Sequence, residues 1–441
     1  MTRGAALLTD HYEFTMLDAA LQAGTAHRDC VFEVFARRLP TDRAYFVNAG
    51  TGRLLDLIEA FRFGDEDLDH LAARAIVSPA TRDWLSGYHF SGDMDGYAEG
   101  EVFLPGSPLL TVRADFATGV LLETLLLSVL NHDVAVATAA SRMWVQAEGR
   151  PLIEMGSRRT HEEAAVAAAR AAWIAGFAST SNTAAGHRYG VPTAGTAAHA
   201  FTLLHDTEEQ AFAAQVAALG TSTTLLVDTY DTLGGVRRAI AIAGTRLGAV
   251  RLDSGNLGEL AHATRNLLDS VGATETRIVA TSDLDEYAIA ELRSAPIDIF
   301  GVGTSVVSGS GHPAAGLVYK LVEVDGRPVA KVASGGKFSV GGWKLAHRRI
   351  GRDGVAVAEL VRTAGVPAHP PADLPDHPHG SGGATAGDER PLVVPLIRDG
   401  ERVYDEDLQA ARDRHAASVA ELPDRARALR ASEPALPILR S

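Results

Sequence analysis

The chain has 441 residues, enough for one large domain and a smaller one, because single hydrophobic cores stop growing well below this length. Apolar residues make up 46% of the chain and charged residues 22%, which excludes a mainly disordered or fibrous protein. The 41 Lys and Arg against 55 Asp and Glu give a net charge of -14, which repels a polyanion and argues against nucleic acid as a partner.

The cysteine content and the apolar runs bear on where the protein resides. Cys30 is the only cysteine, so an intramolecular disulfide or a cysteine-rich zinc site cannot form. No apolar stretch long enough for a secretory signal precedes Asp10. The most apolar run, residues 119–129, contains Glu123 and falls short of the roughly 20 residues that a membrane span needs. We therefore expect a cytoplasmic protein with no membrane partner, in which residues 119–129 form a buried helix.

Residues 1–118 have a mixed pattern, which predicts a separate N-terminal α+β module. A helix is expected from about residue 12 to 23, and short strands over 32–40 and 97–106. From about residue 150 short β-branched runs alternate with Ala-rich helical stretches, the first helix being introduced by a capping box of Thr160 and Glu163. Such alternation predicts βαβ units and a parallel sheet.

Polar or Gly-rich residues follow nearly every predicted strand between residues 119 and 315. This is the pattern of the active-site face of a (β/α) barrel, whereas a doubly wound sheet, the alternative, would concentrate its chemistry at one switch point. We therefore predict an α/β barrel over 119–315. The strand ends are Ser157-Arg158-Arg159, His199 after the predicted strand 191–196, Asp228 with Asp231, Asp253-Ser254-Gly255, Ser282-Asp283 and Gly301 to Thr304.

After about residue 315 the pattern becomes β-like again, so residues 316–441 are expected to return to the small module. Residues 364–389 are rich in Pro, Gly, Ala and His and predict a disordered surface insertion rather than a metal-binding tract. A helix is expected over 405–429.

Two of the strand ends have the chemistry of anion sites. Arg158 and Arg159 lie between a strand and a helix, where guanidinium groups and first-turn N–H groups together bind a phosphate or pyrophosphate; the alternative is an ordinary surface pair. The turn from Gly301 to Thr304 follows a late strand, where barrels commonly hold a phosphate through backbone N–H groups.

His199 and the acidic residues after it form a second candidate group. A lone histidine is usually a core or surface residue, but Asp228 and Asp231 end the next clear strand, and a neighbouring carboxylate can orient an imidazole and raise its nucleophilicity. Arg251 and Asp253 project to the same side of their strand, which favours a functional pair over a structural one.

Two other phosphate-binding patterns fit poorly. Residues 225–235 superficially resemble the phosphoribosyl pyrophosphate loop of type I phosphoribosyltransferases, but the two acids are not adjacent and no Thr-Gly-Gly-Thr follows. The chain contains no GxxxxGK[ST], so any ATP is not held by a P-loop.

These residues, taken in order, resemble the nicotinate phosphoribosyltransferases of NAD salvage, over nearly the whole chain. The resemblance implies the type II phosphoribosyltransferase fold, an irregular α/β barrel with an open-faced sandwich module, and a homodimer with active sites at the subunit interface. The matching motifs are LLTDHYEFTM at 7–16, FEVFARRLP at 32–40, GSRRTHEEA at 156–164, GFASTSN at 176–182, GTAAHAF at 195–201, LLVDTYD at 225–231, VRLDSGN at 250–256, TSDLDEYAI at 281–289, FGVGT at 300–304, YKL at 319–321 and AKVASGGKFSVGGWK at 330–344.

The resemblance also implies an activity: nicotinate, phosphoribosyl pyrophosphate and ATP, with Mg²⁺, give nicotinate mononucleotide, pyrophosphate, ADP and phosphate. In that family His199 matches the histidine that ATP phosphorylates, and Asp228 its carboxylate partner. Tyr12 resembles the ring that stacks on the pyridine from the other subunit. The remaining carried-over residues are Arg158 near the pyrophosphate, Arg251 and Asp253 beside base and ribose, Ser282, Gly301, Gly303 and Thr304 around the 5-phosphate, and Lys337 at a basic position without a fixed role.

The chain departs from the family pattern in ways that bear on affinity. Met155 stands where many relatives have Phe, so a thioether would form the second face of the pyridine sandwich. Thr180 and Ser181 stand in a family motif, and nicotinamide-using relatives carry Asp at the position of Ser181, so a hydroxyl there predicts nicotinate as the substrate. Asn256 replaces an Asp.

Three readings of different classes remain open: this salvage enzyme, in a nicotinate-using or nicotinamide-using form; a phosphosugar-processing barrel lyase or isomerase; and a catalytically silent relative. An isomerase would need a Lys or Glu base at a strand end, where the chain offers Asp, Arg and His. A silent relative is expected to have lost His199 or Arg158, and both are present.

Overall fold

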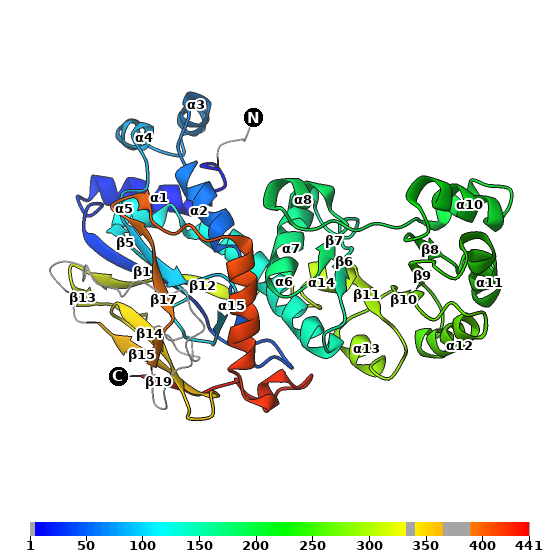
Figure 1. Ribbon diagram of the computed structural model, residues 1–441. Coiled ribbons are helices and arrows are strands. Elements are labelled where there is room, and N and C mark those ends of the chain that lie inside the picture. The colour runs from blue at the N-terminus through cyan, green and yellow to red at the C-terminus, as the bar shows by residue number, and fades with distance from the viewer. Residues whose placement is uncertain (1–4, 332–339, 365–388, 441) are drawn as a thin grey trace. The chain divides into compact units, whose positions relative to one another are not determined.

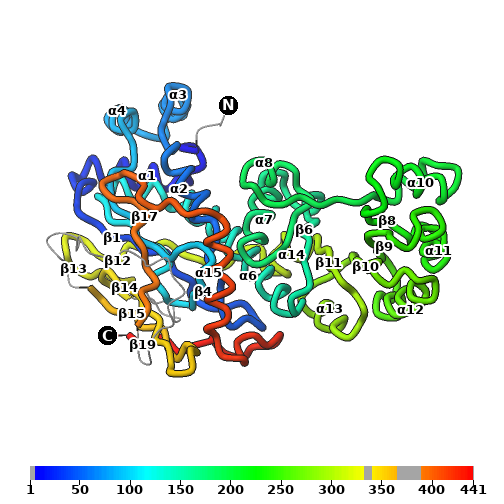
Figure 2. Tube along the Cα trace, viewed as in Figure 1, coloured from blue at the N-terminus to red at the C-terminus, as the bar shows by residue number. Residues whose placement is uncertain are grey.

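The computed structural model describes residues 5–331, 340–364 and 389–440. The chain forms two compact units: unit 1 comprises residues 1–135 and 314–441, and unit 2 comprises residues 136–313. In Figure 2 the blue-to-cyan and yellow-to-red parts of the chain trace unit 1, and the green part traces unit 2. Most of the predicted insertion 364–389, as well as Lys337, lies outside the described residues.

Unit 1 is built on antiparallel pairing between segments from the two ends of the chain. Strand β1 (Asp29–Ala36) pairs with both β12 (Leu317–Val324) and β5 (Leu110–Asp115), so the returning chain extends a sheet begun by the N-terminal residues. The full order of this sheet is β13 (Arg327–Pro328), β12, β1, β5, β3 (Asp93–Tyr97), β17 (Val393–Arg398) and β18 (Glu401–Arg402). Two smaller sheets are β16 (Glu389–Pro391), β14 (Lys344–Ile350), β15 (Ala356–Thr363) and β19 (Ile438–Arg440), and β2 (Phe46–Val47) with β4 (Val102–Phe103).

The helices of unit 1 include the two that the sequence predicts near the chain's ends. The helix predicted from residue 12 corresponds to α1, and the predicted helix 405–429 is interrupted because Pro423 cannot continue it, leaving α15 and a short 3₁₀ turn. The helices are α1 (His11–Gln22), α2 (Thr51–Glu59), α3 (Asp65–Ala73), α4 (Pro79–Ser86), α5 (Phe116–Val120) and α15 (Leu408–Ala420), and the 3₁₀ turn is Asp424–Arg427.

One helical stretch, residues 116–147, contains α5 and the long helix α6 (Glu123–Ala147). It is long and apolar enough to cross a membrane by length and composition, with a mean hydropathy of 1.6 in one window, but 67% of that window is buried inside the structure. Such burial is what a core helix shows, and residues 119–129 are mostly buried as the sequence predicts. Because α6 runs through residue 135, the boundary between the units falls inside a helix, not at the predicted 118.

Unit 2 contains a six-stranded parallel sheet, as the alternation of strands and helices predicts. Its order is β7 (Ser179–Thr180), β6 (Leu152–Glu154), β11 (Ile299–Val302), β10 (Arg277–Ala280), β9 (Ala249–Leu252) and β8 (Thr224–Leu226). β7 and β8 stand at the two ends of this order, and β7 is also joined to the segment around Thr193 by one isolated bridge. The predicted strand 191–196 is wrong: it makes only an isolated bridge, Thr180 to Thr193, because Pro192 cannot donate to a ladder.

Helices connect these strands, and α10, α11 and α12 lie in a row beside β8 and β9 (Figure 1). Several are capped directly after a strand end: Asn182, Asp231 and Asn256 each accept a backbone N–H at a helix start. The predicted capping box is wrong by one residue, since His161, not Thr160, caps α7. The helices are α7 (Glu162–Ile174), α8 (Thr183–Tyr189), α9 (His199–Leu203), α10 (Glu208–Leu219), α11 (Thr232–Ala243), α12 (Leu257–Ser270), α13 (Glu286–Glu291) and α14 (Thr304–Val307).

Candidate active site

Strands β8, β9 and β10 are neighbours in the sheet, and their carboxyl ends place polar side chains at one edge. Leu226 of β8 lies opposite Arg251 of β9, which in turn lies opposite Val279 of β10. Asp228, Asp253 and Thr281 therefore follow three adjacent strands at the same level. This is the edge at which parallel α/β sheets bind their ligands.

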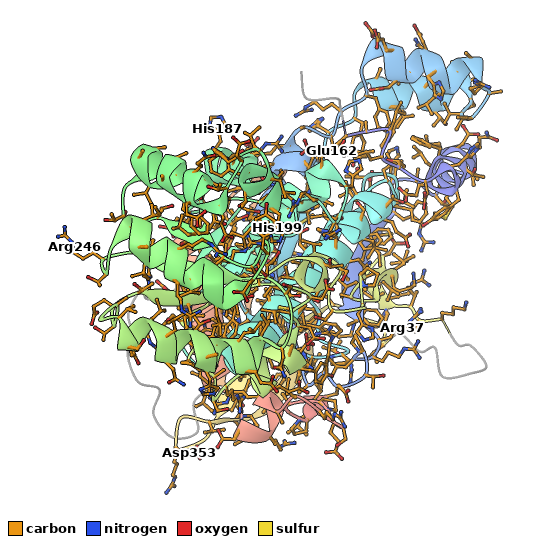
Figure 3. All side chains as sticks on the ribbon, turned by 90° about the vertical axis from the view of Figure 1, so that its right-hand side faces the viewer. Arg37, Glu162, His187, His199, Arg246 and Asp353 are labelled. Atoms are coloured by element: carbon orange, nitrogen blue, oxygen red, sulfur yellow. The ribbon has the colours of Figure 1, made fainter. Side chains whose placement is uncertain are left out.

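His199 lies beside two of these carboxylates. Its Nε2 is 3.7 Å from Asp253 Oδ2 and 4.0 Å from Asp228 Oδ1, and its Nδ1 is 3.4 Å from Thr229 Oγ1. In Figure 3, the labelled side chain of Arg246, in the loop before β9, points into solvent. The imidazole is 42% exposed, so one edge of the ring is open to an incoming group.

Asp228 is the more constrained of the two carboxylates. Its side chain is 1% exposed, and Oδ2 accepts hydrogen bonds of 2.8 Å from the backbone N–H of Asp253 and from Ser254 Oγ. Its Oδ1 is buried without a hydrogen-bond partner and faces His199. A buried carboxylate oxygen left free in this way is suited to orient an imidazole and to stabilise its positive charge. Asp231, the other acid of the motif, instead caps α11 through Gly234 N–H at 2.7 Å.

Arg251 binds protein groups with every nitrogen of its guanidinium. Nε donates to Thr281 Oγ1 at 2.8 Å and Nη2 to Asp253 Oδ1 at 2.9 Å, so the two side chains do share one side of the strand. Nη1 donates to Thr196 Oγ1 at 3.1 Å and to the carbonyl of Ala197 at 3.2 Å. Arg251 thus fastens the segment that precedes His199 to the strand ends. Thr196 and Thr281 cannot be recognised as site residues from the sequence, because threonine is common and nothing in the sequence marks these two.

The ends of β6 and β7 carry the other predicted binding residues of unit 2. Arg158 and Ser181 are exposed and Met155 is half-buried, whereas Thr180 is fully buried and donates its hydroxyl to Glu154. Thr180 therefore holds the loops after β6 and β7 through this buried hydrogen bond. Glu154 is a carboxylate at a strand end that the sequence analysis passed over; it is fully buried, so it does not offer the exposed base that an isomerase needs.

The β10 and β11 ends form the predicted phosphate turn. Ser282 has a φ of 127°, a conformation that a non-glycine residue adopts only when its surroundings enforce it. Gly301 leaves space for the side chain of Met155, since a Cβ there would lie 2.8 Å from Met155 Sδ. Gly303 precedes α14, which begins at Thr304. These residues lie beside the β6 end because β11 pairs with β6.

Tyr12 belongs to unit 1, where it lies in α1. The side chain is 45% exposed at the second position of α1. Partial burial and the neighbouring carboxylate of Glu123, to which the phenol hydrogen-bonds, raise the pKa of Tyr12. The phenol therefore stays protonated near neutral pH, and its ring is open on the surface of unit 1.

A metal ion held by protein side chains alone is not indicated. Among the described residues, no group of three or more His, Cys, Asp or Glu could hold one. Asp253 Oδ1 already accepts from Arg251 and Thr281, and Asp228 Oδ1 is buried without a hydrogen-bond partner beside His199. Mg²⁺ fits this arrangement only as an ion carried mainly by substrate phosphates, which is its common mode of binding.

Comparisons with known proteins show which family the chain resembles. A model of the nicotinate phosphoribosyltransferase N-terminal domain matches residues 7–131. The chain is 56% identical over 441 residues to nicotinate phosphoribosyltransferase pncB1 of Mycobacterium tuberculosis, covering 98% of this chain and 94% of the relative. It is 37% identical to the Bacillus subtilis nicotinate phosphoribosyltransferase over 73% of this chain and 68% of the relative.

The structural comparison agrees with the sequence comparison. The crystal structure of human nicotinic acid phosphoribosyltransferase matches with a TM-score of 0.82 and 26% identity, covering 98% of this chain and 97% of that chain. The mixed α/β architecture, with a curled parallel sheet, is common to both. With this agreement in sequence and fold over its whole length, the chain belongs to the nicotinate phosphoribosyltransferase family.

Proposed function

We propose that the protein joins nicotinate to phosphoribosyl pyrophosphate, forming nicotinate mononucleotide and pyrophosphate in the first step of NAD salvage from nicotinate, and that it couples this step to ATP hydrolysis. The observation that carries the proposal is the group of His199, Asp228, Asp253 and Arg251 at the strand ends of a chain that belongs to this family. We also propose that the curled sheet of unit 2 and its helices form an irregular α/β barrel.

In the transfer step, the anomeric carbon loses pyrophosphate and gains the pyridine nitrogen. Arg158, exposed at the β6 end, would bind the leaving pyrophosphate, and Asp253 would stabilise positive charge on the ribose ring. Ser282 and the turn from Gly301 to Thr304 would hold the 5-phosphate through backbone N–H groups. Mg²⁺, bound to the pyrophosphate, would neutralise charge on the leaving group.

In the ATP step, His199 would attack the γ-phosphoryl group. The Nε2 edge of the ring faces Asp228 and Asp253, which disperse the positive charge that develops when the imidazole forms its bond to phosphorus. ADP leaves, and water later releases phosphate from the histidine. The phosphohistidine adds negative charge next to the strand ends and favours the conformation that binds substrates more tightly.

Selectivity for nicotinate over nicotinamide is proposed to depend on Ser181, which is exposed at the β7 end. Ser181→Asp should raise the KM for nicotinate about tenfold or more, because a carboxylate there repels the carboxylate of the substrate and accepts a hydrogen bond from an amide. Steady-state kinetics with both bases check this. Ser179→Asp, in the preceding strand position, is the matched control; unchanged nicotinate kinetics in Ser181→Asp would remove Ser181 from the base site.

We further propose a cytoplasmic homodimer in which Tyr12 serves the site of the partner subunit. Large apolar side chains are exposed near both proposed contact points: Leu7 and Leu8 before Tyr12 in unit 1, and Leu203 and Leu204 after His199 in unit 2. Such exposed side chains are suited to burial in a second copy; full burial of an exposed Leu contributes about 1.5–3 kcal/mol, and these partly buried residues contribute a fraction of that.

Shared sites predict complementation between two inactive variants. Tyr12→Ala and Arg158→Ala should each lose most activity, and their co-expression should restore about a quarter of the parent value, because half of the dimers are mixed and each mixed dimer has one intact site. The measurement is nicotinate mononucleotide formation by the purified mixture. An additive response, with no gain on mixing, would show that Tyr12 and Arg158 serve the same subunit's site.

The proposal as a whole is tested by product identification. The protein, phosphoribosyl pyrophosphate, ATP and Mg²⁺ are incubated with nicotinate or with nicotinamide, and the nucleotide is identified by mass spectrometry. Nicotinate mononucleotide is the expected product. A nucleotide formed from nicotinamide alone would support the nicotinamide-using alternative.

A further inference from the structure

Glu154 is the last residue of β6, and its carboxyl group is fully buried beneath two loops that carry proposed binding residues. Burial raises the pKa of Glu154, while hydrogen bonds from Thr180 and Gly156 lower it by less. A buried acid without a charged partner in its immediate surroundings costs stability. Its presence at a strand end therefore calls for a reason other than stability.

The carboxyl group closes a ring of hydrogen bonds between the two loops. Oε1 accepts from Gly156 N–H in the first loop and Oε2 from Thr180 Oγ1 in the second, each at 2.5 Å. Thr180 Oγ1 in turn accepts from the N–H of Asn182 at 3.0 Å, and Asn182 Nδ2 donates back to Ser157 Oγ at 3.0 Å.

The ring has little freedom to shift. A Cβ at Gly156 would lie 2.1 Å from Val307 Cγ1, so the first loop is packed tightly against α14. The N–H of Ser181 also donates to the backbone carbonyl of Glu154 at 2.8 Å. Arg158 lies directly after Ser157, and Ser181 lies between Thr180 and Asn182, so a displacement of the ring displaces both residues.

The chemistry of the ring favours a carboxylate over a carboxamide. Gly156 N–H can only donate, whereas the Thr180 hydroxyl can donate and accept; here it donates to Glu154 and accepts from Asn182. A glutamine that keeps its oxygen toward Gly156 would turn its NH₂ group toward Thr180 Oγ1. The amide therefore preserves the shape of the ring but reverses one of the two loop contacts and removes the negative charge that strengthens both.

We propose that Glu154 is a positioning residue for the phosphoribosyl transfer: its carboxylate fixes the loops 155–158 and 180–182 to each other, so that Arg158 and Ser181 meet the pyrophosphate and the base in one geometry. This inference rests on the proposed function, because it takes from it the roles of Arg158 and Ser181. Glu154 itself touches no substrate in this account.

The test combines kinetics with thermal stability. In Glu154→Gln we expect kcat/KM for phosphoribosyl pyrophosphate to fall about 10- to 100-fold, because displacements near 1 Å cost on this order. We expect the Tm to stay or rise, because the variant no longer buries an acid. A role in folding alone would instead lower the Tm together with activity. Asp298→Asn is the matched control: that carboxylate accepts the N–H of Ile278 at 2.7 Å, at the amino-terminal edge of the same sheet, and its loss should leave kcat/KM unchanged.

A second pair of variants tests the same ring at Thr180. Thr180→Ser keeps the hydroxyl and should retain parental kinetics, whereas Thr180→Val keeps the shape and should reproduce the defect of Glu154→Gln. If Glu154→Gln fails to fold, the kinetics of Thr180→Ser and Thr180→Val test the role of the hydrogen-bonded ring instead.

Failure of the inference and failure of the proposed function are distinguishable. Parental kinetics in Glu154→Gln and Thr180→Val, with nicotinate mononucleotide formed by the parent, would overturn the role of Glu154 alone. If the parent forms no nicotinate mononucleotide, calorimetric binding of phosphoribosyl pyrophosphate to parent and variants still decides: equal affinity overturns the inference, and at least fivefold weaker binding by the variants supports it.

Discussion

His199→Ala should abolish ATP hydrolysis while leaving a slow, ATP-independent synthesis of nicotinate mononucleotide. We expect ATPase activity at least 100-fold below the parent, since removal of a nucleophile removes the covalent route. The transfer step should continue, because Arg158, Asp253 and the phosphate turn do not depend on the imidazole for their chemistry. The ATP-driven fall in the KM for phosphoribosyl pyrophosphate should disappear. Parallel assays of ADP and nucleotide product measure both effects.

The phosphoryl acceptor can be checked directly. Acid-labile, base-stable phosphate should appear on the parent and be absent from His199→Ala. His205→Ala is the matched control: its Nδ1 lies 2.8 Å from the carbonyl of Phe201, just after the short helix α9 that begins with His199, and its loss should leave phosphorylation intact. ATP hydrolysis in step with product formation by His199→Ala would assign the phosphoryl group to another residue.

Asp228→Asn should slow phosphorylation of His199 about 100-fold or more. The amide oxygen can still accept from Asp253 N–H and Ser254 Oγ, so the turn keeps its shape. The position facing the imidazole loses its negative charge, and an amide N–H there opposes the tautomer and the charge that attack on phosphorus requires. Rapid-quench measurement of phosphoenzyme formation gives the rate.

Asp231→Asn is the control for this second variant. Asp231 accepts the N–H of Gly234 as the cap of α11, and Asn caps a helix about as well as Asp. Phosphorylation and stability should both match the parent. A similar loss in Asp231→Asn and Asp228→Asn would mean that the acids act through the fold of the turn and not through the imidazole.

The contrast between these two acids shows how far the sequence determines the site. The alternation of strands and helices predicts the parallel sheet and the edge at which Asp228, Arg251 and Asp253 gather, because periodicity and strand polarity are local properties. The local pattern does not separate Asp228 from Asp231; only the family resemblance selects Asp228 as the partner of His199. Which acid faces His199 depends on the backbone path after β8, which turns one carboxylate inward and leaves the other to start a helix.

Contacts between distant segments were also beyond sequence reasoning. The sequence predicts Arg251 only as the partner of Asp253 beside base and ribose, whereas in the structure its guanidinium also donates to Thr196, Ala197 and Thr281. Glu154 cannot be recognised from the sequence, because a Glu at the end of an apolar run belongs to no motif that marks a functional residue. The predicted strand 191–196 is a different case, because Pro192, which removes a donor from the ladder, is visible in the sequence and argues against a strand there.

The most direct test is the stoichiometry of the coupled reaction. The protein is supplied with phosphoribosyl pyrophosphate, Mg²⁺ and a limiting amount of ATP, with or without nicotinate, and the amounts of ADP and nicotinate mononucleotide are measured. Beyond the one equivalent of ADP per subunit that phosphorylation of His199 releases, we expect both products to accumulate only when nicotinate is present, with ADP formed in about equal amount to nucleotide while ATP lasts, because each ATP-coupled turnover passes through one phosphorylation of His199. Nucleotide formed at the same rate and affinity without ATP, or ADP formed independently of nucleotide, would contradict the coupling of the two reactions through this site.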